Sequence, residues 1–355
     1  MQPITVITSL ETIVEDAERQ RRLLRGAVWA GVVFIVAAFL FAVGYPLVVR
    51  WQLRQHGWTL SGGKFLSEPP RWIPEWAEHW VDQFDDASLQ RASLRVEDLE
   101  LLRRYPQLTM ISFESTDVSE PALRGLSQLS QLECLDFDSA RLEGDGVRHL
   151  AAFPNLRQLS FFHMTLDEAA LEGLGACNQI KTLSLGSVKL RDEDLRHLSR
   201  NSGLEWLGID RCDVTDRGLE HIAQCKNLPR LDLRATLITD DGLASLAQLP
   251  HLKSLTLQMG KFTDAGAKQI AASCPGLKYL HLCKEPITDA ALREFSRLPR
   301  LEQLNLDSVP ITDDGIRHLK SCSSLKTLNL QNTQVGGSGV EDLRKSLPTL
   351  NATIK

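Results

Sequence analysis

The hydrophobic residues of this chain follow a short pattern that predicts one strand and one helix. In the segment 227–250, three leucines are spaced as LxxLxL at Leu228, Leu231 and Leu233. Two apolar side chains separated by one polar residue are typical of a short strand with one buried face. Thr239 follows, where a hydroxyl can cap a helix, and a proline ends the run. One such unit cannot cover its own apolar face, so it requires neighbouring copies.

Copies of this unit run through most of the chain. The first apolar residue of the box recurs in steps of 24 residues, with one step of 25, at Leu108, Leu132, Leu156, Ile180, Leu204, Leu228, Leu252, Leu277, Leu301 and Leu325. The residues that begin each predicted helix also recur, as Val214-Thr215-Asp216, Ile238-Thr239-Asp240, Phe262-Thr263-Asp264, Ile287-Thr288-Asp289 and Ile311-Thr312-Asp313. A register held over ten boxes predicts a stack of repeats that share one core.

These boxes and helix starts resemble leucine-rich repeats. The same register reaches back to Phe84 and forward to Leu350, so the resemblance covers residues 84–355. It implies an α/β fold, namely a right-handed leucine-rich-repeat solenoid. Parallel strands would form its concave face, and short helices would form its convex face.

Residues 26–49 contain no charged side chain and predict one transmembrane helix. Such a helix would be about 36 Å long, compared with about 30 Å for the hydrocarbon core of a bilayer. A cleaved signal peptide is the alternative, but the apolar run is too long and no small-residue cleavage site closes it. The charged N-terminal segment 1–25 carries four arginines near the span, against Arg50 and Arg54 after it. We therefore predict a cytoplasmic N-terminus and extracytoplasmic repeats.

Residues 50–83 are expected to form a juxtamembrane linker and a Trp-rich capping helix. Tryptophans fall every four residues at Trp72, Trp76 and Trp80. This stripe either caps the first repeat or rests on the membrane surface, and the cap is favoured because the stripe runs directly into the first strand register. Together with the span and the repeats, it resembles bacterial single-pass membrane proteins with leucine-rich repeats. That resemblance implies an architecture and little chemistry.

Composition and motifs argue against several classes of function. The net charge of −5 and the pI near 6.0 give no basic face for a nucleic-acid partner. We find no GxSxG elbow, no HExxH pair, no phosphate-binding P-loop and no kinase signature. The sequence therefore predicts a protein that is not an enzyme and that uses no cofactor, no metal and no small-molecule substrate. Paired carboxylates at the helix starts are expected to act as favourable charges at helix N-termini.

Cysteines and histidines also recur with the repeats. Thiols stand three residues before a box on alternate repeats, at Cys177, Cys225, Cys274 and Cys322. Alternate strands of a sheet lie about 10 Å apart, whereas a disulfide requires Cα atoms within about 7 Å, so we expect buried unpaired thiols. These repeats are similar to the cysteine-containing repeats of many F-box proteins. One helix position, predicted to be solvated on the convex side, is occupied by His149, His197, His221 and His318.

The outward strand positions and the residues that follow them carry the candidate binding surface. Most of these residues are small or polar. The exceptions selected as partner-binding candidates are Phe162, His163, Trp206, Asp210, Arg211, Arg230, Arg234, Tyr279 and His281. Exposed aromatic side chains close to arginines are typical of protein-binding hot spots. The alternative is that Trp206 only stacks on Arg230 from the neighbouring strand.

The sequence thus predicts a membrane-anchored scaffold that recognises a protein or peptide on its concave face. Its second contact would be the lipid bilayer, through residues 26–49. One alternative is a substrate-receptor adaptor of the F-box type found in ubiquitin ligases, which would need an F-box within residues 1–83. Another is a purely structural envelope protein, which predicts a featureless concave face. Trp206 and Arg230 argue against that second alternative.

Overall fold

The computed structural model describes residues 54, 58–61, 86–90, 93–94, 96–142 and 146–354. The predicted charged segment at 1–25, the transmembrane helix at 26–49 and the Trp-rich helix lie outside these residues. Within the described residues, no helix is both long enough and apolar enough to cross a membrane. Residues 57–61 and 85–355 form one compact unit, which contains the repeats.

The described residues form one large sheet of 13 strands, most of them contributed by the repeats. Its strands, in spatial order, are β1 (Trp58–Ser61), β2 (Asp86–Gln90), β3 (Met110–Glu114), β5 (Cys134–Asp138), β7 (Gln158–Phe162), β8 (Thr182–Gly186), β9 (Trp206–Asp210), β10 (Arg230–Arg234), β11 (Ser254–Gln258), β12 (Tyr279–Cys283), β13 (Gln303–Asn305), β14 (Thr327–Asn329) and β15 (Asn351–Thr353). From β2 onward each strand pairs in parallel with the next, residue for residue at the repeat spacing. A small second sheet joins β4 (Asp117–Val118) and β6 (Arg141–Leu142).

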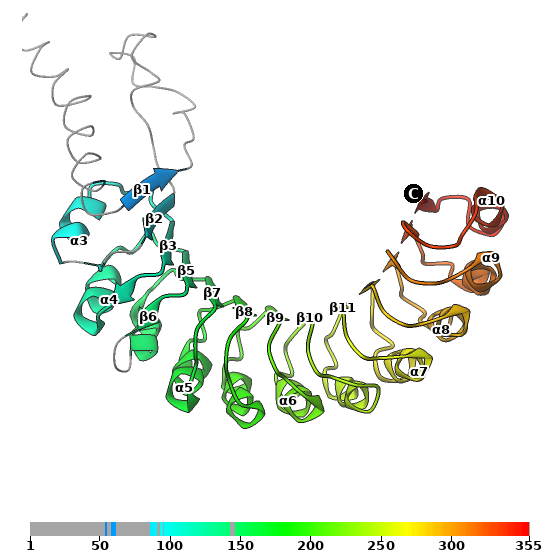
Figure 1. The fold of residues 1–355 in the computed structure, drawn as a ribbon, viewed down its shortest axis with the longest axis horizontal. Coiled ribbons are helices and arrows are strands. Elements are labelled where there is room, and N and C mark those ends of the chain that lie inside the picture. The colour runs from blue at the N-terminus through cyan, green and yellow to red at the C-terminus, as the bar shows by residue number, and fades with distance from the viewer. Residues whose placement is uncertain are drawn as a thin grey trace, which may run out of the picture. The chain divides into compact units, whose positions relative to one another are not determined.

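Each repeat strand of the large sheet from β2 to β14 is followed by one short helical segment, or by two in succession after β13. These segments are α3 (Val96–Leu102), α4 (Glu120–Leu126), η3 (Gly146–Ala152), α5 (Glu168–Ala176), η4 (Asp192–Arg200), α6 (Asp216–Ile222), η5 (Gly242–Gln248), α7 (Asp264–Ser273), α8 (Asp289–Phe295), α9 (Asp313–Ile316) with η6 (Arg317–Ser321), and α10 (Gly337–Ser346). Figure 1 shows the strands of this unit on the inner side of its arc and the helices on the outer side. The predicted placement of parallel strands and short helices is confirmed for the described repeats.

The box residues form the core, as their spacing predicts. In β10, Leu231 and Leu233 are buried, while Arg230 and Arg234 on the other face are exposed. In the first repeats, phenylalanines replace the third leucine of the box and stack with ring centroids 5.3 Å apart, at Phe113, Phe137 and Phe161. The predicted burial of the four repeated cysteines is confirmed, and each of them is a free thiol.

The N-terminal edge of the sheet contains a strand that the sequence did not predict. Strand β1 pairs antiparallel with β2, from Trp58 opposite Leu89 to Ser61 opposite Asp86. The segment reads WTLS, and aromatic and β-branched residues favour a strand. Because β1 covers the edge of β2, it occupies the unpaired backbone groups that an edge strand would otherwise expose. The sheet therefore includes part of the segment that we expected to be a linker.

The Ile-Thr-Asp helix starts hold neighbouring repeats together. The Asp289 carboxylate accepts hydrogen bonds from the backbone N–H of Thr312 at 2.8 Å and from its hydroxyl at 2.6 Å, in the next repeat. The Thr312 hydroxyl in turn accepts from the N–H of Asp314. The same exchange links Asp192, Asp216, Asp240 and Asp264 to the threonine of the following repeat. Each of these carboxylates therefore hydrogen-bonds one repeat to the next, and it also places a negative charge near a helix start.

One of the predicted helix caps is wrong. The helical segment after Thr239 begins at Gly242, and no side chain caps it. The Thr239 hydroxyl donates to Asp216, as the equivalent threonines do to their aspartates, but this segment begins three residues after Thr239 rather than directly after it, so no N–H of its first turn bonds to the hydroxyl. The predicted cap is confirmed at the equivalent threonines of four other repeats: Thr215, Thr263, Thr288 and Thr312.

Candidate functional site

The structure places the nine candidate residues on the outward face of four strands and on two turns that follow them. Phe162 ends β7, and His163 follows it. Strand β9 begins with Trp206 and ends with Asp210, before Arg211. The remaining candidates lie on β10 and β12: Arg230, Arg234, Tyr279 and His281. His163 and Arg211 occupy left-handed turn positions, with φ of 52° and 51°.

Trp206 is the centre of a polar cluster on β9 and β10. Its indole lies across its own strand above Gly208, where a Cβ atom would come within 2.9 Å of the ring. The indole N–H donates to Asp232 Oδ2 at 2.9 Å, and the Arg230 guanidinium donates to the same oxygen at 3.1 Å. Arg230 also lies over the Trp206 ring, 5.5 Å from its centroid. The stack that was the alternative interpretation of Trp206 is therefore present.

Asp232 explains why these side chains converge, and it was not among the candidates that the sequence indicated. It is only 3% exposed, so its negative charge needs donors nearby. Trp206 on β9 and Arg230 on β10 provide those donors. The sequence could have indicated Asp232 by its position. It is an aspartate on an outward strand position between Arg230 and Arg234, and Trp206 lies on the neighbouring strand.

Across β11, His281 lies opposite Asp232, and Cys283 lies opposite Arg234. Burial lowers the pKa of His281, Asp232 opposes that change, and the positive charges of Arg230 and Arg234 lower the pKa further. The Arg234 charge also acts on the thiol of Cys283, although burial keeps the pKa of that thiol raised. These influences reach from β10 to β12, which are both paired with β11.

The other candidate residues form separate local pairs. The Phe162 ring covers Gly186 of β8, so a side chain there would overlap it. His163 Nδ1 lies 2.8 Å from Asp138 Oδ1, and Arg211 pairs with Asp210 at 3.0 Å. Phe162 and Arg234 share one row of the sheet but stand three strands apart. The structure therefore groups Trp206, Arg230, Arg234, Tyr279 and His281, together with Asp232, into what we call the central patch.

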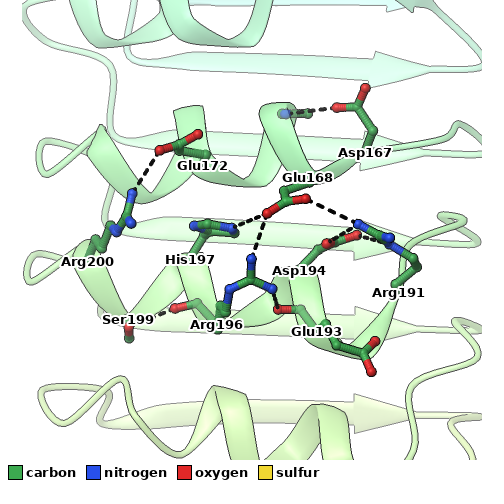
Figure 2. A network of polar contacts seen from close by, with 11 residues as sticks. Asp167, Glu168, Glu172, Arg191, Glu193, Asp194, Arg196, His197, Ser199 and Arg200 are labelled. Atoms are coloured by element: carbon green, nitrogen blue, oxygen red, sulfur yellow. Dashed lines mark hydrogen bonds and ion pairs between the residues drawn. The ribbon is translucent and has the colours of Figure 1, made fainter.

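The convex side carries a second polar network, drawn in Figure 2. Glu168 accepts from Arg196 at 2.6 Å and from Arg191 at 3.4 Å, and Arg191 also binds Asp194 through two nitrogens at 2.7 and 2.8 Å. Asp194 is buried at 1% exposure. These contacts join η4 to α5, so we assign the network to packing between repeats.

This packing corrects the prediction for one histidine. His197 was expected to be solvated, but it is 6% exposed and its Nε2 lies 3.4 Å from Glu168 Oε1. Its helix position faces the neighbouring helix rather than water, because adjacent repeats pack closely. His149 is half-buried against Glu120, and His318 is exposed as expected. Within the described part of the chain, no group of three or more His, Cys, Asp or Glu side chains could hold a metal ion.

Comparisons with known proteins agree with this architecture. The family model described as Leucine Rich repeat matches residues 248–271 and 321–343. With its boxes in register on a parallel sheet, the chain is a leucine-rich repeat protein. No curated protein sequence matches it.

Several solved structures are similar to this chain. An internalin from Listeria monocytogenes has 15% identity and a TM-score of 0.48, over 76% of this chain and 86% of that chain. Internalin C2 from the same organism has 23% identity and a TM-score of 0.45, over 58% and 84%. The plant peptide hormone receptor RGFR1 in complex with RGF2 has 18% identity and a TM-score of 0.42, over 75% and 42%.

Proposed function

We propose that this protein is a membrane-anchored scaffold that recognises a protein or peptide through the central patch on its concave face. One observation supports this most: large aromatic and guanidinium groups gather on β9, β10 and β12, while most other outward positions are small or polar. Arginine and large aromatic side chains dominate the energetics of protein interfaces. Solenoids of stacked repeats present such extended concave surfaces to their partners.

The proposed role is recognition without catalysis. Burial raises the pKa of the Cys283 thiol, so the cysteine next to the patch is protonated at neutral pH and is a poor nucleophile. The carboxylate of Asp232 is engaged by Trp206 and Arg230. The remaining groups of the patch are suited to hydrogen bonding, stacking and charge pairing.

The proposed anchor is the uncharged segment at 26–49. A helix of that length can cross a bilayer with some tilt. The arginines before it favour a cytoplasmic N-terminus, which would place the repeats on the other side of the membrane. Alkaline extraction of membranes tests the anchor, and protease digestion of intact cells tests the orientation. Full release of the chain by alkali, or repeats shielded from external protease, would contradict this part of the proposal.

The recognition role is tested with full-length chains expressed in their own cells and crosslinked there. We compare Trp206→Ala and Tyr279→Ala with Arg293→Ala, whose side chain is exposed on the convex helix α8. Quantitative mass spectrometry should show the same captured proteins for wild type and Arg293→Ala, and their loss from both patch variants. Unfolding temperatures serve as the folding control. Identical capture by all four chains would refute recognition through the patch.

A further inference from the structure

We propose that the outward face of β11 receives an extended segment of a partner protein in which an acidic side chain lies next to a large apolar side chain. This inference rests on the proposed recognition function and names the chemistry of the partner. We call this face, with the side chains of β10 and β12 that flank it, the β11 strip. Three independent features of the strip support the proposal.

The first feature is the arrangement of side-chain sizes. Strand β11 presents Ser254, Thr256 and Gln258 outward. In the sheet register, Ser254 lies between Arg230 and Tyr279, and Thr256 lies between Asp232 and His281. The small side chains of Ser254 and Thr256 on β11 therefore lie between larger side chains on β10 and on β12. Since neighbouring strands are about 4.8 Å apart, the flanking strands are separated by about 10 Å, which is the width of an extended peptide with its side chains.

The second feature is charge without a partner. Arg234 is exposed, and among the described residues it has neither an ion pair nor a hydrogen bond through its side chain. Arg230 is 54% exposed at its side chain, although one edge of it is bound to Asp232. Asp232 already has donors from Trp206 and Arg230, so it does not neutralise Arg234 as well. The strip therefore carries a positive charge that an acidic side chain would complement.

Polar groups of the strip are also free to bind. In the part of the chain that the structure describes, the side chains of Ser254, Thr256 and His281 make no hydrogen bond. Some polar groups elsewhere on the concave side are paired, as Asn332 is with Asp307 at 2.8 Å. Ser254 and His281 are half-buried and Thr256 is buried, and donors left unpaired at such positions favour a ligand that supplies acceptors.

The third feature is the presence of two exposed apolar side chains on the turns at one end of the strip. Among the described residues, the large hydrophobic side chains that are exposed are Met259, at 52%, and Leu237, at 40%. Met259 directly follows Gln258 on the turn after β11, and Leu237 lies on the turn after β10. Both turns lie beyond the strand end at which Arg234 stands. Methionine adapts to differently shaped apolar partners, so an apolar side chain beside the acidic one would find a contact here.

The test uses the full-length chain, immobilised in detergent, to select peptides from a library of displayed random dodecapeptides. We expect enriched sequences to carry Asp or Glu next to Leu, Ile, Met or Phe. A synthetic peptide of the enriched sequence is then titrated against wild type, Trp206→Ala, Arg234→Glu, Arg234→Gln and Met259→Ser. The matched control is Arg293→Glu, which reverses an exposed arginine on the convex side.

We expect Arg234→Glu to weaken binding by about tenfold to hundredfold and Arg293→Glu to leave it unchanged, because a charge-assisted contact has that magnitude. Replacing the acidic residue of the peptide by its amide should weaken binding to wild type and have no further effect on Arg234→Gln. Enriched peptides without an acidic preference, or with affinities that Arg234→Glu leaves unchanged, would overturn this inference. If Trp206→Ala still abolished their binding, recognition by the central patch would stand. Peptides that bind all variants equally would overturn both proposals.

Discussion

The indole nitrogen of Trp206 donates a hydrogen bond of 2.9 Å to Asp232, which stands on the neighbouring strand and two positions further along it. This contact fixes a large aromatic ring flat on the concave sheet. The hydrogen bond also offsets part of the free-energy cost of burying the charged carboxylate of Asp232, which is 3% exposed. The same residue therefore contributes to stability and to the shape of the candidate binding surface, and the two roles can be separated by substitution.

Trp206→Phe keeps an aromatic ring beneath Arg230 but removes the N–H that Asp232 accepts. Because Asp232 is buried and charged, we expect the free energy of unfolding to fall by about 1.5–3 kcal/mol. The measurement is urea unfolding of the full-length protein. The matched control is Tyr279→Phe, since no hydrogen bond to the Tyr279 hydroxyl is seen among the described residues, and it should change stability by less than about 0.5 kcal/mol. Equal effects of the two substitutions would contradict the role given to the indole N–H.

The hydrogen bonds between the Asp216 carboxylate and Thr239 leave no room for a side chain at Gly242. A Cβ atom on Gly242 would overlap the Asp216 carboxylate, which holds Thr239 of the next repeat. We therefore expect Gly242→Ala to destabilise the protein by about 1–3 kcal/mol, as overpacking does. Thermal unfolding measures the effect.

Gly337→Ala is the control for that experiment. Gly337 also begins a helical segment, but nothing lies within 4 Å of a Cβ atom placed on it. It should leave stability unchanged or raise it by about 0.4–1 kcal/mol, because alanine restricts the unfolded chain. A destabilisation by Gly337→Ala as large as that by Gly242→Ala would argue against overlap with the Asp216 carboxylate as the cause.

Glu285 should make the stability of the repeats depend on pH near neutrality. It is 2% exposed, one oxygen accepts the N–H of Gly260 at 2.8 Å, and burial raises its pKa to about 7. Because folding raises this pKa, the folded protein holds the proton more tightly than the unfolded chain. Its stabilising contribution is complete below about pH 4.5 and is lost as the pH rises toward 7, by about 1.4 kcal/mol per unit at most.

Glu285→Gln removes this titration and keeps an acceptor for Gly260. The expected result is a higher unfolding temperature than wild type at pH 8 and a much smaller difference at pH 5. The measurement is calorimetry at both pH values. A stability difference between wild type and Glu285→Gln that is the same at pH 5 and pH 8 would show that Glu285 does not titrate in this range.

The cysteines provide a chemical test of burial. Burial raises the pKa of Cys225 and of Cys274 to about 12, so neither presents a thiolate at neutral pH. Cys134 and Cys283 are half-buried on the concave face. We expect alkylation by iodoacetamide at pH 8, followed by mass spectrometry, to modify Cys134 and Cys283 first. Modification of Cys225 or Cys274 at the same rate in the native protein would contradict the buried stack.

The sequence predicted the repeats because their main signal is local. Leu231 and Leu233 are two residues apart, and the alternation of a strand alone decides that both enter the core while Arg230 and Arg234 face outward. A fixed register of 24 or 25 residues then determines which outward residues become neighbours. The 24-residue spacing between Trp206 and Arg230 therefore suffices to predict that they stand side by side on adjacent strands.

Features that depend on contacts between repeats were not predicted. Thr239 has the local sequence of a helix cap, but the helical segment that follows it begins only at Gly242 and no side chain caps it. His197 follows the rule for an exposed helix position, but the neighbouring helix buries it. Strand β1 pairs with a strand that lies far along the chain, and nothing within its four residues encodes that partner.

The most direct test of recognition through the concave face is photo-crosslinking from the two sides of one repeat. Gln258 lies on the outward face of β11, and Gln269 is exposed on the convex helix α7. A photoreactive phenylalanine replaces each glutamine in turn in the full-length protein, which is irradiated in its own cells. We expect a discrete protein adduct from position 258 that disappears when Tyr279→Ala is added, and no such adduct from position 269. An adduct from position 269 alone, or one from position 258 that persists with Tyr279→Ala, would contradict this expectation.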